Sequence, residues 1–419
     1  MDGERNIRAS RRIQASLTQR RRVAGGTVVK DLERTDRRRM RALNTQLVLD
    51  CIRKAELTSQ ADLIRATKLN TGTIVSIVRD LRERGLVVGA GQGPSRGGRR
   101  PALLRLNPSA AAVLSCQVGT EVATAAVLDL GATILSRREW AVEAARGPEP
   151  FLAALVACLR DQLQAPALKG RRLAGLGLSL HGAVDAERGV LRVSEHLGWY
   201  DVPFRDELQR ALGIPVFAEG EARAIALAEQ RWGAASKARD FVLIELDAGF
   251  GMVQVLDGRL CRGSHGLAGE LGFTVWDTAD RSAEERRPRI LEDLASLKAL
   301  CGRAEQVGAV AAVAVEPSVS ETIEEVWLRR LVLASRAGSL EARQSLDDAA
   351  RAIGLAVANV INLLDPELIL LTGRMASGAD GYLLEPIRAC VREHLVGARS
   401  RVPRIEPAGL GPDAALLGA

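Results

Sequence analysis

Small hydroxyl and arginine side chains gather near the N-terminus in a pattern that could recognise DNA. Four of them lie on the polar side of one helical stretch: Thr71, Thr73, Ser76 and Arg79. A glycine-rich segment, GAGQGPSRGGRRP at 89–101, carries three more: Arg96, Arg99 and Arg100. Hydroxyl and guanidinium groups hydrogen-bond to base edges and phosphates, and arginines on a flexible tether can enter a narrow minor groove. These seven side chains are the candidate DNA contacts.

The elements that would position them begin with two helices. A helical apolar pattern starts near Arg41, and its inward face is expected to hold Leu43, Leu47, Val48, Cys51 and Ile52. Ser59, with Asp62 three residues later, forms a capping-box pattern. This pattern predicts a short helix over 60–67 whose inward apolar residues are Leu63 and Ile64.

A third helix and a wing complete the unit. Residues 68–70 are predicted as a turn, Thr71 is expected to cap a helix that runs to Arg84, and Gly85 suits the position after its end. The buried stripe of this helix is expected to be Ile74, Ile77, Val78 and Leu81. In a helix-turn-helix the third helix enters the major groove with its N-terminal residues against base edges. Residues 86–88 and 102–106 are predicted as the wing strands.

The positive charge of the chain is concentrated at its beginning. Residues 1–41 contain twelve arginines and Lys30 against five acids, which is about the whole of the net charge of +7. A basic arm beside a folded unit indicates contact with phosphate backbones. The alternative is a solvated tail without a partner.

Length and composition limit the class of protein. The chain has 419 residues, of which 47% are hydrophobic and 3% aromatic, which is typical of two or three globular domains. It has neither an apolar run of membrane length nor the apolar core of a secretory signal. Its six cysteines are scattered without a CxxC pair, which argues against a disulfide framework or a cysteine zinc site. We therefore expect a cytoplasmic protein without a membrane partner.

From about residue 111, apolar strands alternate with helices. A hairpin is predicted over 113–128, helices over 151–163, 222–232 and 349–364, and buried strands over 173–180, 216–218, 241–246 and 368–371. This order is typical of an α/β domain with a mixed sheet.

The motifs of this region resemble those of the ROK family, which groups repressors, open reading frames and sugar kinases. The resemblance covers nearly the whole chain from about Arg41. It includes, in order, GGRRPALLRLNP at 97–108, GLGLSLHGAVD at 175–185, HLGWYDVPFRDEL at 196–208, RGSHGLAGELG at 262–272 and INLLDPELILLTG at 361–373. The resemblance implies a two-lobed, actin-like sugar-kinase fold, and the N-terminal winged helix is similar to that of the repressor branch.

The kinase residues that the resemblance implies are largely replaced. The first phosphate turn, DIGGT in family kinases, reads QVGTE at 117–121, so that Gln117 replaces an aspartate and Glu121 is added. The second, GTGIG, reads DAGFG at 247–251, and Asp247 adds a further negative charge. The catalytic segment, ENDAN, reads EGEAR at 219–223, where Gly220 replaces an asparagine and Glu221 carries the carboxylate on a longer side chain. We therefore predict no catalytic residue and no enzyme activity.

The family's zinc segment is also absent, while parts of its sugar site remain. Phe273 stands where the family has a zinc-binding histidine, and residues 274–291 contain neither Cys nor His, so no metal or other cofactor is expected. The resemblance implies an effector site formed by Glu270, Glu292, His265, His196 and Glu221. Glu270 and Glu292 could instead be ordinary cleft-lining carboxylates. His181, which replaces a family proline, is interpreted as structural.

These observations predict a basic arm over 1–40, a winged helix-turn-helix over 41–108 and a sugar-kinase-like effector and dimerisation domain over 109–419. The expected function is that of a DNA-binding repressor of carbohydrate genes. Its expected partners are operator DNA, a sugar effector and a second copy of the chain, as a dimer or a dimer of dimers. Two alternatives remain: a sugar kinase with an added DNA-binding domain, and a DNA-binding regulator that needs no ligand.

Overall fold

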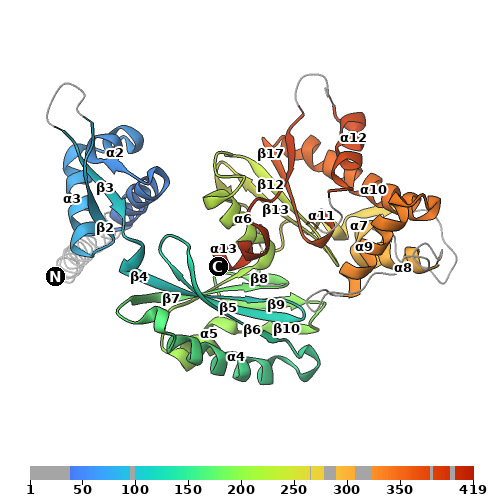
Figure 1. Ribbon diagram of the computed structural model, residues 1–419, viewed down its shortest axis with the longest axis horizontal. Helices are drawn as coiled ribbons and strands as arrows, with labels where there is room; N and C mark the ends of the chain where they lie inside the picture. The colour runs from blue at the N-terminus through green and yellow to red at the C-terminus, as the bar shows by residue number, and fades with distance from the viewer. Residues whose placement is uncertain are drawn as a thin grey trace, which may run out of the picture. The chain divides into compact units, whose positions relative to one another are not determined.

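The chain divides into two units in the computed structural model. The model describes residues 38–94, 100–264, 266–277, 289–306, 323–377, 381–396 and 402–419. The first unit contains the residues up to Ala111 together with the turn 129–133, and the second contains the rest (Figure 1). Each unit has its own buried apolar core.

The first unit is a winged helix-turn-helix. Helical residues 38–55 are followed by β1 (Thr58–Ser59), α2 (Gln60–Thr67), α3 (Thr71–Glu83), β2 (Val87–Gln92) and β3 (Ala102–Leu106). The three strands form a sheet in the order β1-β3-β2, and β2 and β3 are antiparallel. The sequence prediction of three helices followed by a wing is therefore confirmed, although the first helix includes residues 38–40, which we assigned to the arm.

The helix caps confirm one prediction and correct another. The side chains and backbones of Ser59 and Asp62 form the predicted reciprocal capping box of α2. On α3, Asn70 is the cap in place of Thr71, because its backbone is extended and its Oδ1 accepts the amide of Thr73 at 2.8 Å. Thr71 is already the first residue of the helix.

The core of this unit is small. All four residues of the predicted stripe on α3 are buried, and they pack with Val48, Ile52 and Leu63. Leu43 and Leu47, which we placed on the inward face of the first helix, are 59% and 43% exposed. The prediction was wrong for these two because the buried stripe of the first helix runs through Val48 and Ile52, one residue along from Leu47, and successive residues of a helix point in different directions.

The second unit contains two five-stranded sheets, of which the first has the order β11-β7-β4-β5-β6. Its strands are β4 (Ala111–Val118), β5 (Val122–Asp129), β6 (Ile134–Ala141), β7 (Arg172–Leu180) and β11 (Val216–Gly220). Helices α4 (Pro148–Leu163) and α5 (Phe204–Leu212) pack against it, and β8 (Ala183–Asp185), β9 (Val190–Ser194) and β10 (Trp199–Val202) form a small separate sheet.

The second sheet has the order β14-β13-β12-β17-β18. Its strands are β12 (Phe241–Leu246), β13 (Phe250–Leu256), β14 (Arg259–Leu260), β17 (Leu368–Thr372) and β18 (Arg404–Pro407). Strand β12 is parallel to β17 and antiparallel to β13, so the sheet is mixed, as predicted.

Alternate residues of β12 pack against different helices, because successive side chains of a strand point to opposite faces. Phe241 and Leu243 pack with α6 (Glu221–Trp232). Val242 and Ile244 belong to a larger core formed by α7 (Leu291–Ala295), α8 (Leu297–Gln306), α9 (Ile323–Arg336), α10 (Leu340–Leu364) and α12 (Leu384–His394). Helix α10 starts nine residues before the predicted helix, at a Ser339 cap. Among the described residues, every helix is too short or too polar to cross a lipid bilayer.

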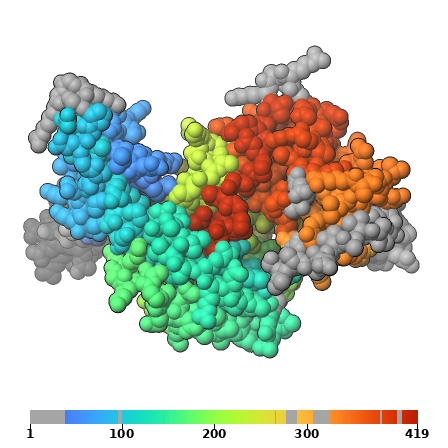
Figure 2. Space-filling model, in the orientation of Figure 1, coloured from blue at the N-terminus to red at the C-terminus, as the bar shows by residue number. Residues whose placement is uncertain are grey.

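The C-terminal segment connects the two sheets of the second unit. Helix α13 (Ala414–Gly418, dark red in Figure 2) reaches the first sheet, where the Ser115 hydroxyl donates to the Leu416 carbonyl at 2.6 Å. Just before it, the Gly409 and Leu410 amides donate to the buried Glu229 carboxylate of α6 at 2.7 and 2.8 Å. The end of the chain therefore helps to hold the two lobes of this unit together.

The cap of α3 gives a stability prediction. Replacing an asparagine cap with alanine costs about 1 kcal/mol, because one helix amide loses its acceptor. We expect Asn70→Ala to speed amide exchange across α3 by about fivefold, and Thr71→Ala to change it much less. Hydrogen-exchange mass spectrometry of the full chain measures both. Equal effects of the two substitutions would contradict the assignment of Asn70 as the cap.

Candidate functional site

A cavity of about 430 Å³ lies in the second unit, where the ends of its two sheets approach each other. The first sheet contributes the turn after β7 and the start of α6, and the second contributes β12, the DAGFG turn and β13. Ligand pockets commonly have volumes of about 300–1,000 Å³. The cavity is therefore large enough for a monosaccharide.

A chain of hydrogen bonds crosses one wall of the cavity. Glu221, the first residue of α6, accepts the side-chain amide of Gln117 at 2.6 Å. Its other oxygen is 3.2 Å from Nδ1 of His181, and Nε2 of His181 is 3.3 Å from Nδ1 of His196. Burial opposes a charge on His181, but the contact with Glu221 and the nearby Glu245 raise its pKa. Burial and His181 lower the pKa of His196, so the proton of this pair belongs on His181.

Asp247 and Arg374 form an ion pair at the turn that corresponds to the second phosphate turn of the family kinases. Nε and a terminal nitrogen of Arg374 lie 2.8 and 2.5 Å from one oxygen of Asp247, and the Arg374 amide donates to the other at 3.1 Å. Burial opposes the charge of Asp247, but these bonds outweigh it and lower its pKa. Our expectation that Asp247 leaves an added negative charge for phosphate to meet was incomplete, because Arg374 compensates that charge.

A glycine allows this pairing. Gly373 has φ of 91°, and a Cβ there would lie 2.5 Å from the Leu246 carbonyl oxygen. No other residue type tolerates both the left-handed backbone and such a close approach. Gly373 thus lets the chain after β17 pass close to the end of β12 and places Arg374 beside Asp247.

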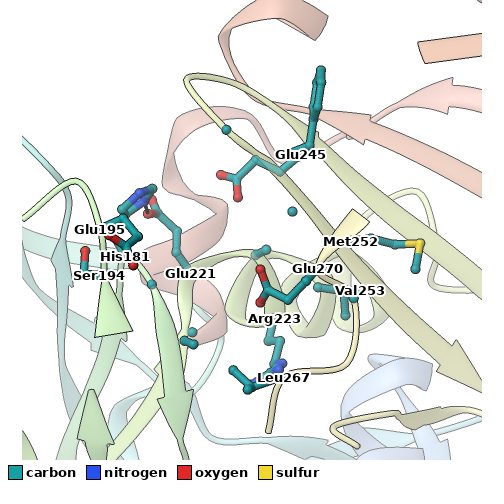
Figure 3. Close-up of a pocket in the computed structure, with 18 of the residues that line it drawn as sticks. His181, Ser194, Glu195, Glu221, Arg223, Glu245, Met252, Val253, Leu267 and Glu270 are labelled. Carbon is teal, nitrogen blue, oxygen red and sulfur yellow. Dashed lines mark hydrogen bonds and ion pairs between the residues drawn. The ribbon is translucent and has the colours of Figure 1, made fainter. Parts of the chain in front are cut away.

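Glu245 is the only charged residue of β12, and its side chain faces the cavity (Figure 3). It is half-buried, and among the described residues no hydrogen-bond donor contacts its carboxylate. Burial and the neighbouring Glu221 raise its pKa to about 8. Without a ligand, Glu245 is therefore largely protonated at neutral pH.

Glu270 and Glu292, the two predicted sugar contacts, both line the cavity. Glu292 accepts the Phe250 amide at 2.9 Å, so one of its oxygens supports the DAGFG turn. No described residue donates a hydrogen bond to Glu270, and its pKa is raised mainly by burial. Arg223 lies nearby (Figure 3), but its guanidinium donates to the carbonyls of Val184 and Gly266.

The other predicted site residues are distributed unevenly. Glu221 and His196 line the cavity, whereas His265 lies outside the described residues. Glu121, which we expected near the phosphates, is exposed and does not line the cavity. Among the residues that the structure describes, no group of three or more His, Cys, Asp or Glu is placed to hold a metal ion.

Sequence reasoning missed three residues of this site. His181, interpreted as structural, contacts Glu221 and lines the cavity. The sequence did indicate Glu245, because this charged residue interrupts the apolar strand FVLIEL. It did not indicate Arg374, because only the fold shows that the ends of β12 and β17 meet.

The candidate DNA contacts lie in the first unit. Thr71 and Arg79 are exposed on α3, and Thr73 and Ser76 are half-buried. Arg100 is exposed at the start of the segment that leads into β3, while Arg96 and Arg99 lie outside the described residues. Arg79 lies 3.9 Å from Glu83, a weak surface pair that leaves the guanidinium accessible. The polar face of α3 is thus available to a ligand.

The raised pKa of Glu245 predicts a pH-dependent stability. Between its ordinary value of 4.5 and about 8, folded Glu245 keeps a proton that the unfolded chain has released, so stability falls as the pH rises through this window. Glutamine cannot ionise. Glu245→Gln should therefore gain stability relative to the parent between pH 5 and pH 8.5, by at least about 1.4 kcal/mol, the equivalent of one pKa unit.

Urea unfolding followed by tryptophan fluorescence tests this prediction, because all five tryptophans lie in the second unit. Glu385→Gln, at an exposed carboxylate that pairs with Arg388, is the matched control and should show the parent's pH dependence. If the unfolding free energies of the parent and of Glu245→Gln depended on pH in the same way, the raised pKa of Glu245 would be contradicted.

Known proteins match both the second unit and the whole chain. Residues 113–419 match the ROK family. The chain is 26% identical over 380 residues to the xylose repressor of Caldicellulosiruptor bescii, covering 90% of this chain and 94% of the repressor. It is 23% identical over 365 residues to the DNA-binding transcriptional dual regulator NagC of Escherichia coli, covering 87% and 88%.

Solved structures of regulators and kinases also resemble this chain. A ROK family transcriptional regulator, a homologue of the E. coli MLC protein, superposes with a TM-score of 0.76 at 27% identity and covers 90% of this chain and 94% of its own. A ROK hexokinase from Thermus thermophilus gives a TM-score of 0.59 at 29% identity but covers only 73% of this chain, with 96% of its own. The family match spans well over half of the sequence, and the chain belongs to the ROK family.

Proposed function

We propose that this chain is a sequence-specific DNA-binding regulator, most simply a repressor, of carbohydrate genes. The observation that carries the proposal is the coverage of its relatives. The xylose repressor and the transcriptional regulator match 90% of the chain and therefore extend into the winged helix-turn-helix, whereas the hexokinase covers 73%. A regulator that binds operator DNA works in the cytoplasm, which we propose as its location.

The first unit supplies the DNA-binding surface in this proposal. Helix α3 would enter the major groove with Thr71, Thr73 and Ser76 toward base edges and Arg79 toward base or phosphate. The wing segment would bring Arg100, together with Arg96 and Arg99, to the minor groove. Residues 41–108 would act as the DNA-binding domain and residues 109–419 as the effector and dimerisation domain.

The second unit is proposed to have lost kinase chemistry. A kinase base must be free to accept a proton from a sugar hydroxyl, but Glu221 already accepts from Gln117 and contacts His181. The ion pair between Asp247 and Arg374 occupies the turn whose backbone amides a kinase would offer to phosphate. Catalysis therefore lacks both a free base and an open phosphate site.

The cavity is proposed as the effector site, with Glu270, Glu292, His196 and Glu221 as ligand contacts and His265 nearby in sequence. Its residues come from both sheets of the second unit, so a ligand that contacts both can favour one arrangement of the lobes. In a dimer, such a change would alter the spacing of two winged helices and hence operator affinity.

Selection from a random DNA duplex pool tests the proposed function. The purified full chain should enrich a defined motif, with two-fold symmetry if a dimer binds. As a control, a variant that lacks residues 1–110 goes through the same selection, and the duplexes that it recovers should stay random. A full chain that enriches no motif would refute sequence-specific binding.

The arginines of the first unit should control salt dependence. Each phosphate contact adds about one to the slope of log affinity against log salt, because counterions are released. The double substitution Arg79→Ala with Arg100→Ala should weaken binding and lower this slope by about one to two. Fluorescence anisotropy with the selected duplex measures it. Arg404→Ala, an arginine of the second unit, is the control and should leave the slope unchanged; an unchanged slope in the double variant would reject this surface.

The loss of kinase chemistry should be visible directly. With ATP, magnesium and a panel of hexoses and pentoses, the purified chain should form no sugar phosphate, because Glu221 is engaged and the phosphate turn is closed by an ion pair. A ROK hexokinase treated identically is the positive control. Stoichiometric turnover by this chain would favour the alternative of a sugar kinase with an added DNA-binding domain.

A further inference from the structure

The cavity is strongly acidic. Six carboxyl groups line it, against the guanidinium of Arg223 and the imidazole of His181, whose pKa is raised. The carboxyl groups belong to Glu195, Glu221, Glu245, Asp247, Glu270 and Glu292. A neutral sugar needs only a few hydrogen-bonding groups for recognition, and a phosphorylated sugar needs cations. The excess of carboxyl groups therefore disfavours a phosphorylated sugar and leaves room for a ligand that carries a positive charge.

Four of these carboxyl groups already have partners. Asp247 pairs with Arg374, Glu292 accepts the Phe250 amide, and Glu195 accepts the Tyr200 hydroxyl at 3.2 Å. Glu221 accepts from Gln117 and contacts His181. Arg223 is held by the carbonyls of Val184 and Gly266 and lies 3.6 Å from Glu219, so it offers little to a ligand.

Glu245 and Glu270 are different. No described residue donates a hydrogen bond to either carboxylate, although both face the cavity together with Glu221 (Figure 3). Elsewhere in this unit, buried carboxylates are satisfied. Glu229 accepts three backbone amides, and Glu219 pairs with Arg262 at 2.5 Å. Glu245 is half-buried and Glu270 is exposed, so these two are the carboxyl groups of the cavity that remain available to a donor brought by a ligand.

We propose that the effector is a polyhydroxylated amine, a sugar or sugar alcohol with a protonated amino group, whose ammonium binds among Glu245, Glu270 and Glu221. This inference rests on the proposed role of the cavity as the effector site. An ammonium supplies three donors and a positive charge, which match carboxylates that lack both. The hydroxyl groups of the same ligand would meet Glu292 and His196. A phosphate group would face carboxylates and be excluded by like charge.

Ionisation gives the proposal a specific signature. Glu245 holds a proton at neutral pH, because burial and Glu221 raise its pKa to about 8. An ammonium beside it favours the ionised form, so binding at pH 7 releases up to about one proton per chain. A neutral sugar has no such effect on the carboxyl group.

Calorimetry of the full chain with matched probes tests the proposal. The probes are 1-amino-1-deoxyglucitol and glucitol, which differ only in the amino group, and glucosamine with glucosamine 6-phosphate. Neighbouring oxygens lower the pKa of these amino groups below that of lysine, so the titrations are run at pH 7 or below, where the ammonium form predominates. We expect the amine to bind at least about tenfold more tightly than glucitol and, in two buffers of different ionisation enthalpy, to release a proton. The 6-phosphate should bind more weakly than glucosamine.

Variants locate the contact. Glu245→Gln and Glu270→Gln should each weaken amine binding by about tenfold or more, and Glu245→Gln should also abolish the proton release. Glu385→Gln removes an exposed carboxylate that does not line the cavity and should bind like the parent. Circular dichroism of each variant verifies that it is folded.

The outcomes are distinct. Glucitol binding as tightly as the amine, tighter binding of the 6-phosphate, or no binding of any probe would each overturn the inference. If the chain selects a DNA motif and a neutral sugar releases it, the proposed function stands while this inference fails. If no motif is selected, the proposed function fails while the calorimetry still decides which ligand the cavity takes.

Discussion

The ion pair between Asp247 and Arg374 organises the centre of the second unit. Parallel strands end at the same edge of a sheet, and these two residues follow the neighbouring parallel strands β12 and β17. The same aspartate also accepts the Ala248 amide with its side chain, and its carbonyl accepts the Leu297 amide at the start of α8. One charged contact thus connects two strands, a turn and a helix, and it does so where a kinase would keep amides free for phosphate.

This pairing also determines the charge of the cavity. Arg374 pairs with Asp247 and lies 3.6 Å from Glu324, so these two carboxylates offset most of its positive charge. Glu245 lies two residues before Asp247, near the end of β12. Burial and Glu221 raise its pKa, and His181 and Arg374 offset only part of that rise.

The sequence predicted those features that depend on near neighbours. The capping box at Ser59, the bounds of α2 and β12, and the buried stripe of α3 follow from spacing within a few residues. The exposure of Leu43 and Leu47 depends on which stripe of the first helix meets its neighbours, and apolar spacing alone did not decide that. The pairing of Asp247 with Arg374 joins residues 127 positions apart, and Gln117 with Glu221 joins residues 104 apart. Such contacts become visible only when the order of the strands is known.

The location of the unpaired carboxyl groups bears on how a ligand could act at a distance. Glu245 belongs to the second sheet, whereas Glu221 begins the helix that follows β11 of the first. An ammonium that contacts both side chains would favour the arrangement in which Glu221 and Glu245 are close, because it pairs with both carboxyl groups at once. Regulation requires only such a difference in affinity between two states, typically 1–3 kcal/mol. A single charged hydrogen bond supplies about that much, which makes the acidic wall of the cavity sufficient, in principle, to couple ligand binding to the arrangement of the lobes.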